Sequence, residues 1–163
     1  QAAVSESDFL WAKAAGLSNT NNRANLTFKH LLSKLVINLH YNDDLTSDLN
    51  FSIHNTLTSS TINLRNGQAT AVGNTRIVYP AKNPATENGF ELKYEAILIP
   101  QAIKAGTPLF SITIDDYILT YAIDQDLELL PQTSYIFNLS IGEAKKTLSP
   151  SLQLLNMEVK RFE

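Results

Sequence analysis

The chain has 163 residues, of which 44% are hydrophobic and 18% charged, and its formal net charge at pH 7 is −3. A chain of this length forms one domain and buries about 70% of its unfolded surface without the help of disulfides or structural metals. The small, scattered charge excludes the basic footprint that nucleic acid or an anionic membrane requires. Without a cysteine, disulfides, thiol catalysis and thiolate metal sites are also excluded.

Residues 1–25 hold the single tryptophan, Trp11, a short alanine-rich stretch that ends at Gly16, and a polar run. Since the chain begins abruptly, we expect a lead-in strand or linker from a missing N-terminal part. The stretch lacks the charged start and long apolar core of a signal peptide, and no apolar run reaches the roughly 18 residues that span a bilayer. We expect residues 26–163 to form a single β-sandwich domain.

The first segment of that domain, residues 26–41, mixes two periodicities. Its start, Leu26 to His30, and its end, Leu35 to Tyr41, alternate like strands, whereas the middle repeats at helical spacing. Because its neighbours read as strands, a lone helix is disfavoured. We expect a strand, a bulge or single helical turn near residues 30–33, and then a second strand.

Short segments rich in Val, Ile, Thr, Tyr and Phe follow, with turn signals about every ten residues. Asn66-Gly67 is the strongest hairpin signal, and Asp115-Asp116 separates two alternating runs that favour a tight hairpin. Residues 90–99 alternate apolar with charged side chains until Ile97 and Ile99 make both faces apolar, which predicts a strand entering the core. The pattern predicts an all-β sandwich or barrel of about seven to nine strands with little helix.

The last third of the chain contains a corner signal and a final strand. Pro131 and Tyr135 precede an alternating strand, and they indicate either a corner where the tyrosine hydroxyl ties back to the backbone or a strand that merely starts there. Residues 152–163 alternate Leu155, Met157 and Val159 with polar side chains. These three residues define a candidate assembly strand, which is either docked in its own sheet or donated to a partner.

No motif predicts catalysis. The three histidines lack close metal-ligand spacing: His30, His40 and His54. Two groups of loop acids do not match a calcium loop: Asp43, Asp44 and Asp48, and Asp124 with Asp126. The glycines are scattered singly, so a phosphate loop or nucleophile elbow is absent. We expect no enzyme activity, metal or cofactor, although carboxylates far apart in sequence can converge in space.

Four stretches in order carry a resemblance: "SDFLWAKA", "LTFKHLLSKLVINL", "AILIPQAIKAGTPLFSITIDDYILTY" and "LELLPQTSYIFNLSI". Together they resemble the fimbrillin-like proteins of Bacteroidales, the major and minor fimbrial subunit superfamily. The resemblance covers the chain from about Ser7 to Gly142, and Gln132 stands where the family usually has glycine. The matching positions are Phe28, His30, Ser33, Lys34, Ile99, Pro100, Gln101, Gly106, Pro131 and Tyr135.

The resemblance implies a transthyretin-like Greek-key β-sandwich, the C-terminal of the two that such subunits usually have. It implies a structural subunit of fimbriae or pili, or of surface adhesion, which joins other fimbrial subunits by a donated strand. The expected location is the cell surface of a Gram-negative bacterium. We expect attachment to the outer membrane only through a lipid anchor outside this chain.

Two other functions are weighed against the subunit. A carbohydrate- or ligand-binding sandwich module would use exposed aromatic side chains as a platform, with Trp11, Tyr41 and Tyr79 as the candidates. An exposed Trp11 beside another aromatic ring would favour the binding module. A Trp11 buried where it holds two parts of the fold together would disfavour it. A small β-barrel enzyme would instead need loop acids that converge in a pocket.

Overall fold

The computed structural model describes residues 7–20, 22–41, 49–143 and 150–162. In these ranges every secondary-structure element is a β-strand, thirteen in all. The excess over the expected seven to nine comes from five strands of only two or three residues, which no periodicity can reveal. Within the described part, no helix is long and apolar enough to cross a membrane.

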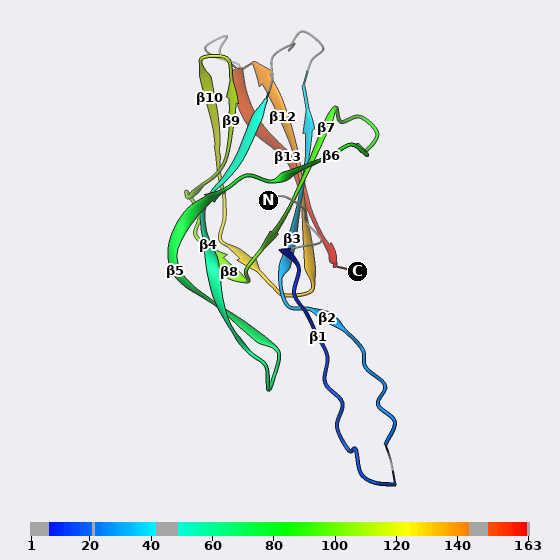
Figure 1. The fold of residues 1–163 in the computed structure, drawn as a ribbon. Helices are drawn as coiled ribbons and strands as arrows, with labels where there is room; N and C mark the ends of the chain where they lie inside the picture. Colours follow the sequence, from blue (N-terminus) through cyan, green and yellow to red (C-terminus); the bar gives the residue numbers. More distant parts are fainter. Residues whose placement is uncertain (1–6, 21, 42–48, 144–149, 163) are drawn as a thin grey trace.

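Two larger sheets lie face to face (Figure 1). One has five strands in the order β13 (Pro150–Arg161), β12 (Thr133–Glu143), β3 (Ser33–His40), β7 (Leu92–Leu98) and β6 (Ala81–Asn83). The other has four, in the order β10 (Tyr117–Ala122), β9 (Pro108–Ile114), β4 (Asn50–Asn63) and β5 (Gln68–Val78). β3 and β12 run parallel, and the other neighbours within these sheets are antiparallel.

Two small ribbons complete the fold. β1 (Leu10–Trp11) pairs with β2 (Lys29–His30), and β11 (Leu127–Leu129) pairs with β8 (Gln101–Ile103). The stretch between β1 and β2 extends away from the two sheets as an arm (Figure 1). The division of the chain at residue 25 stays a prediction.

One apolar core joins the two large sheets. Phe110 of β9 meets Phe137 of β12 edge-on with ring centroids 4.9 Å apart, and Phe51 of β4 lies 5.2 Å from Tyr94 of β7. A smaller cluster of Leu32, Ile97 and Ile99 forms apart from this core. Burial of both sets supplies the main favourable free energy of folding.

The local expectations for the strands are confirmed at three places. Residues 26–41 form β2, a break at Leu31 and Leu32, and then β3, although the break is a bend between two sheets and not the expected bulge or helical turn. Asp115 and Asp116 form the two-residue turn of the β9–β10 hairpin, because Ile114 pairs directly with Tyr117. On β7 the even-numbered side chains enter the main core and Ile97 enters the smaller cluster.

The corner before β12 is also confirmed. The Tyr135 hydroxyl donates a 2.6 Å hydrogen bond to the Glu128 carbonyl and accepts one of 2.9 Å from the Leu130 amide. Gln132, in the same loop, has a φ of 58°. Glycine adopts such an angle without steric cost. This explains why the proteins that the chain resembles usually have glycine at the position of Gln132.

Candidate functional site

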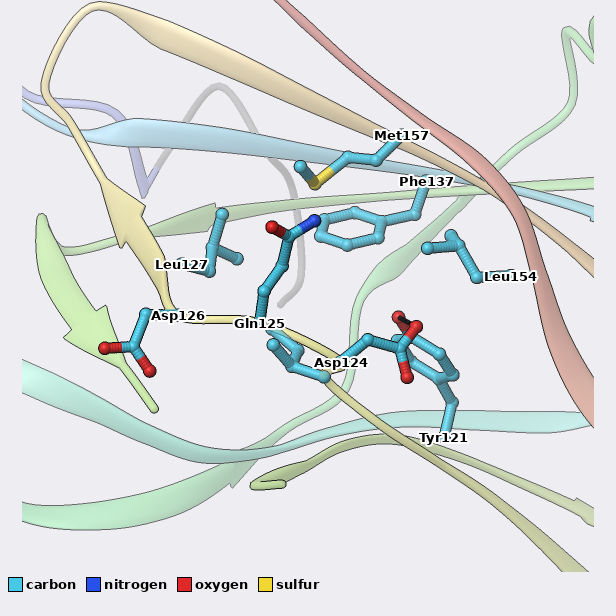
Figure 2. Close-up of a pocket in the computed structure, with 9 residues that line it drawn as sticks. Tyr121, Asp124, Gln125, Asp126, Leu127, Phe137, Leu154 and Met157 are labelled. Atoms are coloured by element: carbon cyan, nitrogen blue, oxygen red, sulfur yellow. Dashed lines mark hydrogen bonds between the residues drawn. The ribbon is translucent and has the colours of Figure 1, made fainter. Parts of the chain in front are cut away.

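An open groove runs along one flank of the molecule, between the end strands β10 and β13 of the two sheets (Figure 2). Its volume is about 360 Å³. The side chains that line it come from β10, the loop after it, β11, β12 and β13: Tyr121, Ile123, Asp124, Gln125, Asp126, Leu127, Phe137, Leu154 and Met157. On the opposite flank the chain passes from β5 into β6 through Tyr79 and Pro80, so the two sheets are covalently joined there.

β13 forms one wall of the groove and is an end strand of its sheet. It pairs with β12 along its length, and among the described residues β12 is its one ladder partner. The outer edge of β13 therefore presents backbone amide and carbonyl groups that a further strand can pair with.

The register of β13 contains a bulge that the sequence pattern did not reveal. Leu139 pairs with Leu154 and Asn138 pairs with Asn156, which leaves Leu155 as the extra residue. The bulge shifts the alternation by one residue, so Leu154 and Met157 both lie on the core side. The candidate assembly residues Leu155, Met157 and Val159 are thus not one continuous face.

Apolar side chains of β13 remain accessible on the core side. Val159 pairs with Tyr135, which is 3% exposed, yet Val159 itself is 56% exposed. Met157 pairs with the buried Phe137 and is 38% exposed. The inner face of β13 is therefore only partly covered at Met157 and Val159, whereas Leu152 near the start of the strand is buried.

The rim of the groove carries two carboxylates with separate partners. Asp124 accepts a 3.2 Å hydrogen bond from the Tyr121 hydroxyl, and burial together with this carboxylate raises the pKa of Tyr121 to about 12. Asp126 binds Lys104 Nζ at 2.6 Å and the Ala105 amide, and these contacts lower the pKa of Asp126. Each carboxylate thus has its own hydrogen-bond partners, and the two point in different directions (Figure 2).

The three histidines lie far apart. His30 Nδ1 contacts Asp8 at 2.6 Å and its ring stacks on Phe162 with centroids 3.8 Å apart. His40 Nδ1 lies 3.1 Å from a Glu91 oxygen. His54 contacts the Ser52 and Ser111 hydroxyls on the outer face of the four-stranded sheet. Within the described ranges, three or more metal-ligating side chains do not gather anywhere; Asp43, Asp44 and Asp48 fall outside those ranges.

The aromatic platform is not assembled. Trp11 covers Gly67 in the β4–β5 turn, where an added Cβ would lie 2.5 Å from the indole ring, and its Nε1 donates to the Leu64 carbonyl at 2.9 Å. Tyr41 packs against the main core, and Tyr79 is 64% exposed elsewhere. Trp11 is a staple between the lead-in and a hairpin, so the observation that would favour a binding platform is missing.

Most residues that carry the resemblance hold the fold together. The Ser33 hydroxyl donates to the Leu130 carbonyl at 2.8 Å, and Lys34 pairs with Glu95 at 3.1 Å. The Gln101 side chain accepts from the Leu57 amide at 2.8 Å and donates to the Leu57 carbonyl at 3.1 Å. It thereby replaces a backbone peptide group beside a bulge of β4. Phe28 differs, because it is 60% exposed on the arm.

Comparisons with known proteins identify the family through a family model and the fold through solved structures. A family model described as fimbrillin-like matches residues 1–158. A candidate cell adhesion protein of Bacteroides uniformis superposes with a TM-score of 0.67 at 20% identity, over 91% of this chain and 57% of that one. A comparable protein of Bacteroides ovatus gives 0.59 at 14% identity, over 91% and 59%.

A third similar structure is the tip fimbrial protein Mfa3 of Porphyromonas gingivalis with a C-terminal truncation. Its TM-score is 0.52 at 9% identity, over 90% of this chain and 59% of that one. The present chain thus spans less than two thirds of the length of these structures. A comparison with curated proteins finds no significant match.

Proposed function

The chain belongs to the fimbrillin-like family, and on that premise we propose that it is a structural subunit of surface fimbriae or of cell-surface adhesion. In this proposal it joins other fimbrial subunits by β-strand addition at the cell surface of a Gram-negative bacterium. Membrane attachment comes through a lipid anchor outside this chain. The observation that carries the proposal is the β10–β13 groove beside the outer edge of β13, which pairs with no other strand in the described part of the chain.

The groove has both features that strand addition requires. The edge of β13 supplies backbone hydrogen bonds, which give affinity. The apolar part of the groove, at Phe137, Leu154 and Met157, takes alternate side chains of the added strand, which gives specificity. Half-covered apolar side chains such as Met157 and Val159 gain further burial when a strand is added. Strand addition needs no catalytic group, because it forms only hydrogen bonds and side-chain contacts.

We propose that β13 stays in its own sheet and receives the added strand. Its extensive pairing with β12 and the burial of Leu152, which is 7% exposed, support this view. Deletion of residues 152–163 is then expected to unfold the domain. A deleted chain that folds but does not assemble would instead identify β13 as the donated strand.

We also propose the Greek-key, transthyretin-like topology for the two sheets. The crossing from β5 to β6, the tyrosine corner before β12 and the parallel neighbours β3 and β12 support it. The assignment to the C-terminal of two sandwiches stays a prediction.

Charged substitutions on the half-covered face of β13 test the subunit function. Met157→Glu introduces a carboxylate into the groove, and Val159→Glu introduces one on the same face of β13 beyond the residues that line the groove. Both side chains are already exposed, so the thermal midpoint should change little. Fibre formation, counted by electron microscopy on cells that express the complete protein, should fall at least tenfold. Ile77→Glu on β5, which is 51% exposed, is the matched control and should leave the fibres unchanged.

Two results would count against the proposal. Fibres of normal number and length in both β13 variants would mean that the groove is not used. An equal loss in Ile77→Glu would mean that surface charge, and not the groove, controls assembly.

A further inference from the structure

A row of three asparagine side chains crosses the outer face of the five-stranded sheet. Asn38 of β3 pairs in register with Asn138 of β12, which pairs in register with Asn156 of β13. The Asn38 amide nitrogen donates to the Asn138 oxygen at 2.8 Å, and the Asn138 nitrogen donates to the Asn156 oxygen at 2.6 Å. The row therefore runs at right angles to the strands and ends at the outer edge of β13.

The row is buried at one end and open at the other. Asn38 is 3% and Asn138 7% exposed, whereas Asn156 is exposed. The Asn38 oxygen is buried and lacks a hydrogen-bond partner among the described residues. Successive amides thus donate in one direction, toward the edge, and each hydrogen bond in such a chain polarises the next. The last donor, the Asn156 amide nitrogen, meets any strand that is added to β13.

The opposite face of the same strands is apolar around the row. Asn38 stands between Ile37 and Leu39, and Asn138 between Phe137 and Leu139; all four of these neighbours are buried in the core. On β13 the core-side neighbour of Asn156 is Met157, which lines the groove. A strand that extends this sheet and fills the groove would repeat the same pattern, with an amide outward and apolar residues inward on either side.

We propose that the strand added to β13 comes from another subunit and carries an Asn or Gln side chain at the position beside Asn156, with apolar residues on either side. This inference rests on the proposed function and names the recognition element of its partner. Stacked amide side chains stabilise neighbouring strands in extended sheets. Asn156 then acts as a specificity residue, since a partner without the amide forgoes one hydrogen bond in the row.

Peptides provide the direct test. The probe is a synthetic peptide with the β12 sequence "TSYIFNLSIGE", which has the apolar–Asn–apolar pattern, carries terminal lysines for solubility and bears a fluorophore. A second peptide has leucine in place of its asparagine. Fluorescence anisotropy gives Kd for both peptides with the wild-type chain. One hydrogen bond corresponds to about a fivefold tighter binding of the asparagine peptide.

Two variants of the chain locate the effect. Asn156→Leu keeps the side-chain size at an exposed position and should bind both peptides equally. Gln153→Leu removes another exposed outward amide of β13, paired with Ser140 rather than with the row, and should keep the fivefold preference.

Equal binding of the two peptides to the wild-type chain would overturn the inference, and so would a preference that survives in Asn156→Leu. Binding of neither peptide would overturn it as well, because the edge of β13 would not accept such a strand. These outcomes are independent of the fibre counts in Met157→Glu and Val159→Glu. If those variants lose fibres but the wild-type chain binds both peptides equally, the subunit function stands. Only the inference that the added strand carries an Asn or Gln beside Asn156 is then rejected.

Discussion

The Tyr135 hydroxyl and the Glu128 carbonyl oxygen lie 2.6 Å apart, seven positions apart in the chain. Around this bond the loop between β11 and β12 is contacted by two further segments of the chain. The Gln132 amide donates to the Leu32 carbonyl at 3.1 Å, and the Phe162 amide donates to the Gln132 carbonyl at 2.8 Å. The corner thus fixes the start of β3, the start of β12 and the end of β13, the strands that bear the asparagine row.

Replacement of Tyr135 by phenylalanine should weaken this corner. The ring remains, but the Glu128 carbonyl and the Leu130 amide each lose a partner in a part-buried place, which costs about 1–3 kcal/mol of unfolding free energy. Urea titration followed by circular dichroism measures it. Tyr117→Phe, at a side chain that is 59% exposed, is the control and should change little; equal effects of the two would contradict the role of the corner.

Gly67→Ala should displace Trp11 from the β4–β5 turn. Alanine at this position has an unfavourable φ of 69°, and its Cβ would lie 2.5 Å from the indole ring. Gly89→Ala has the same backbone problem at a φ of 83° but meets nothing within 4 Å. The backbone conformation should lower the unfolding free energy of each variant by about 1–2 kcal/mol. Gly67→Ala should lose more, because its Cβ also clashes with Trp11.

Tryptophan fluorescence separates the two glycine variants. Because Trp11 is the single tryptophan of the chain, its emission should move to longer wavelength in Gly67→Ala and stay in place in Gly89→Ala. Identical spectra for both variants would show that Trp11 does not depend on the space above Gly67.

Gln101→Glu should destabilise the junction of β4 and β8. The amide nitrogen donates to the Leu57 and Ile99 carbonyls at 3.1 and 3.0 Å, and a carboxylate would set its charge against both oxygens. We expect a loss of about 2 kcal/mol at pH 7, partly recovered below pH 4 as the introduced acid takes up a proton. Gln125→Glu, an exposed change of equal charge, should have little effect; a matching loss there would refute the specific role of Gln101.

Alkaline pH should weaken the fold through Tyr121. Burial and the Asp124 carboxylate raise the pKa of Tyr121 to about 12, whereas an unfolded tyrosine titrates near pH 10. The favourable contribution is therefore complete below pH 10 and is lost as the pH rises toward 12. Urea titrations at pH 9 and pH 11.5 should show a smaller loss in Tyr121→Phe than in wild type. An unchanged pH dependence would contradict this assignment.

Local signals predicted the parts of the fold that depend on neighbouring residues. Residues close together in the sequence determine four of these features: the hairpin at Asp115-Asp116, the strand break at Leu31, the alternation of β7 and the corner at Tyr135. The resemblance identified the family because its motifs keep those same local features. Gln132 stands where the family usually has glycine, and its φ of 58° is a left-handed conformation that glycine adopts easily. The backbone conformation of the corner is therefore kept although the residue differs.

Features of the candidate site depended on register between distant strands and were not predictable. The bulge at Leu155 changes which side chains of β13 share a face, and a regular alternation in the sequence conceals it. The asparagine row needs three strands to align at Asn38, Asn138 and Asn156. Its one sequence signal was an asparagine in the middle of an apolar stretch in each strand.

Backbone hydrogen exchange across β13 tests the central claim of strand addition most directly. Amide exchange rates of residues 151–161 are measured by mass spectrometry in the isolated chain and in assembled fibres. Added strands should slow the β13 amides that do not bond to β12 by at least tenfold, while the amides of β12 keep their rates. Fibres in which every β13 amide exchanges as in the isolated chain would show that subunits join elsewhere.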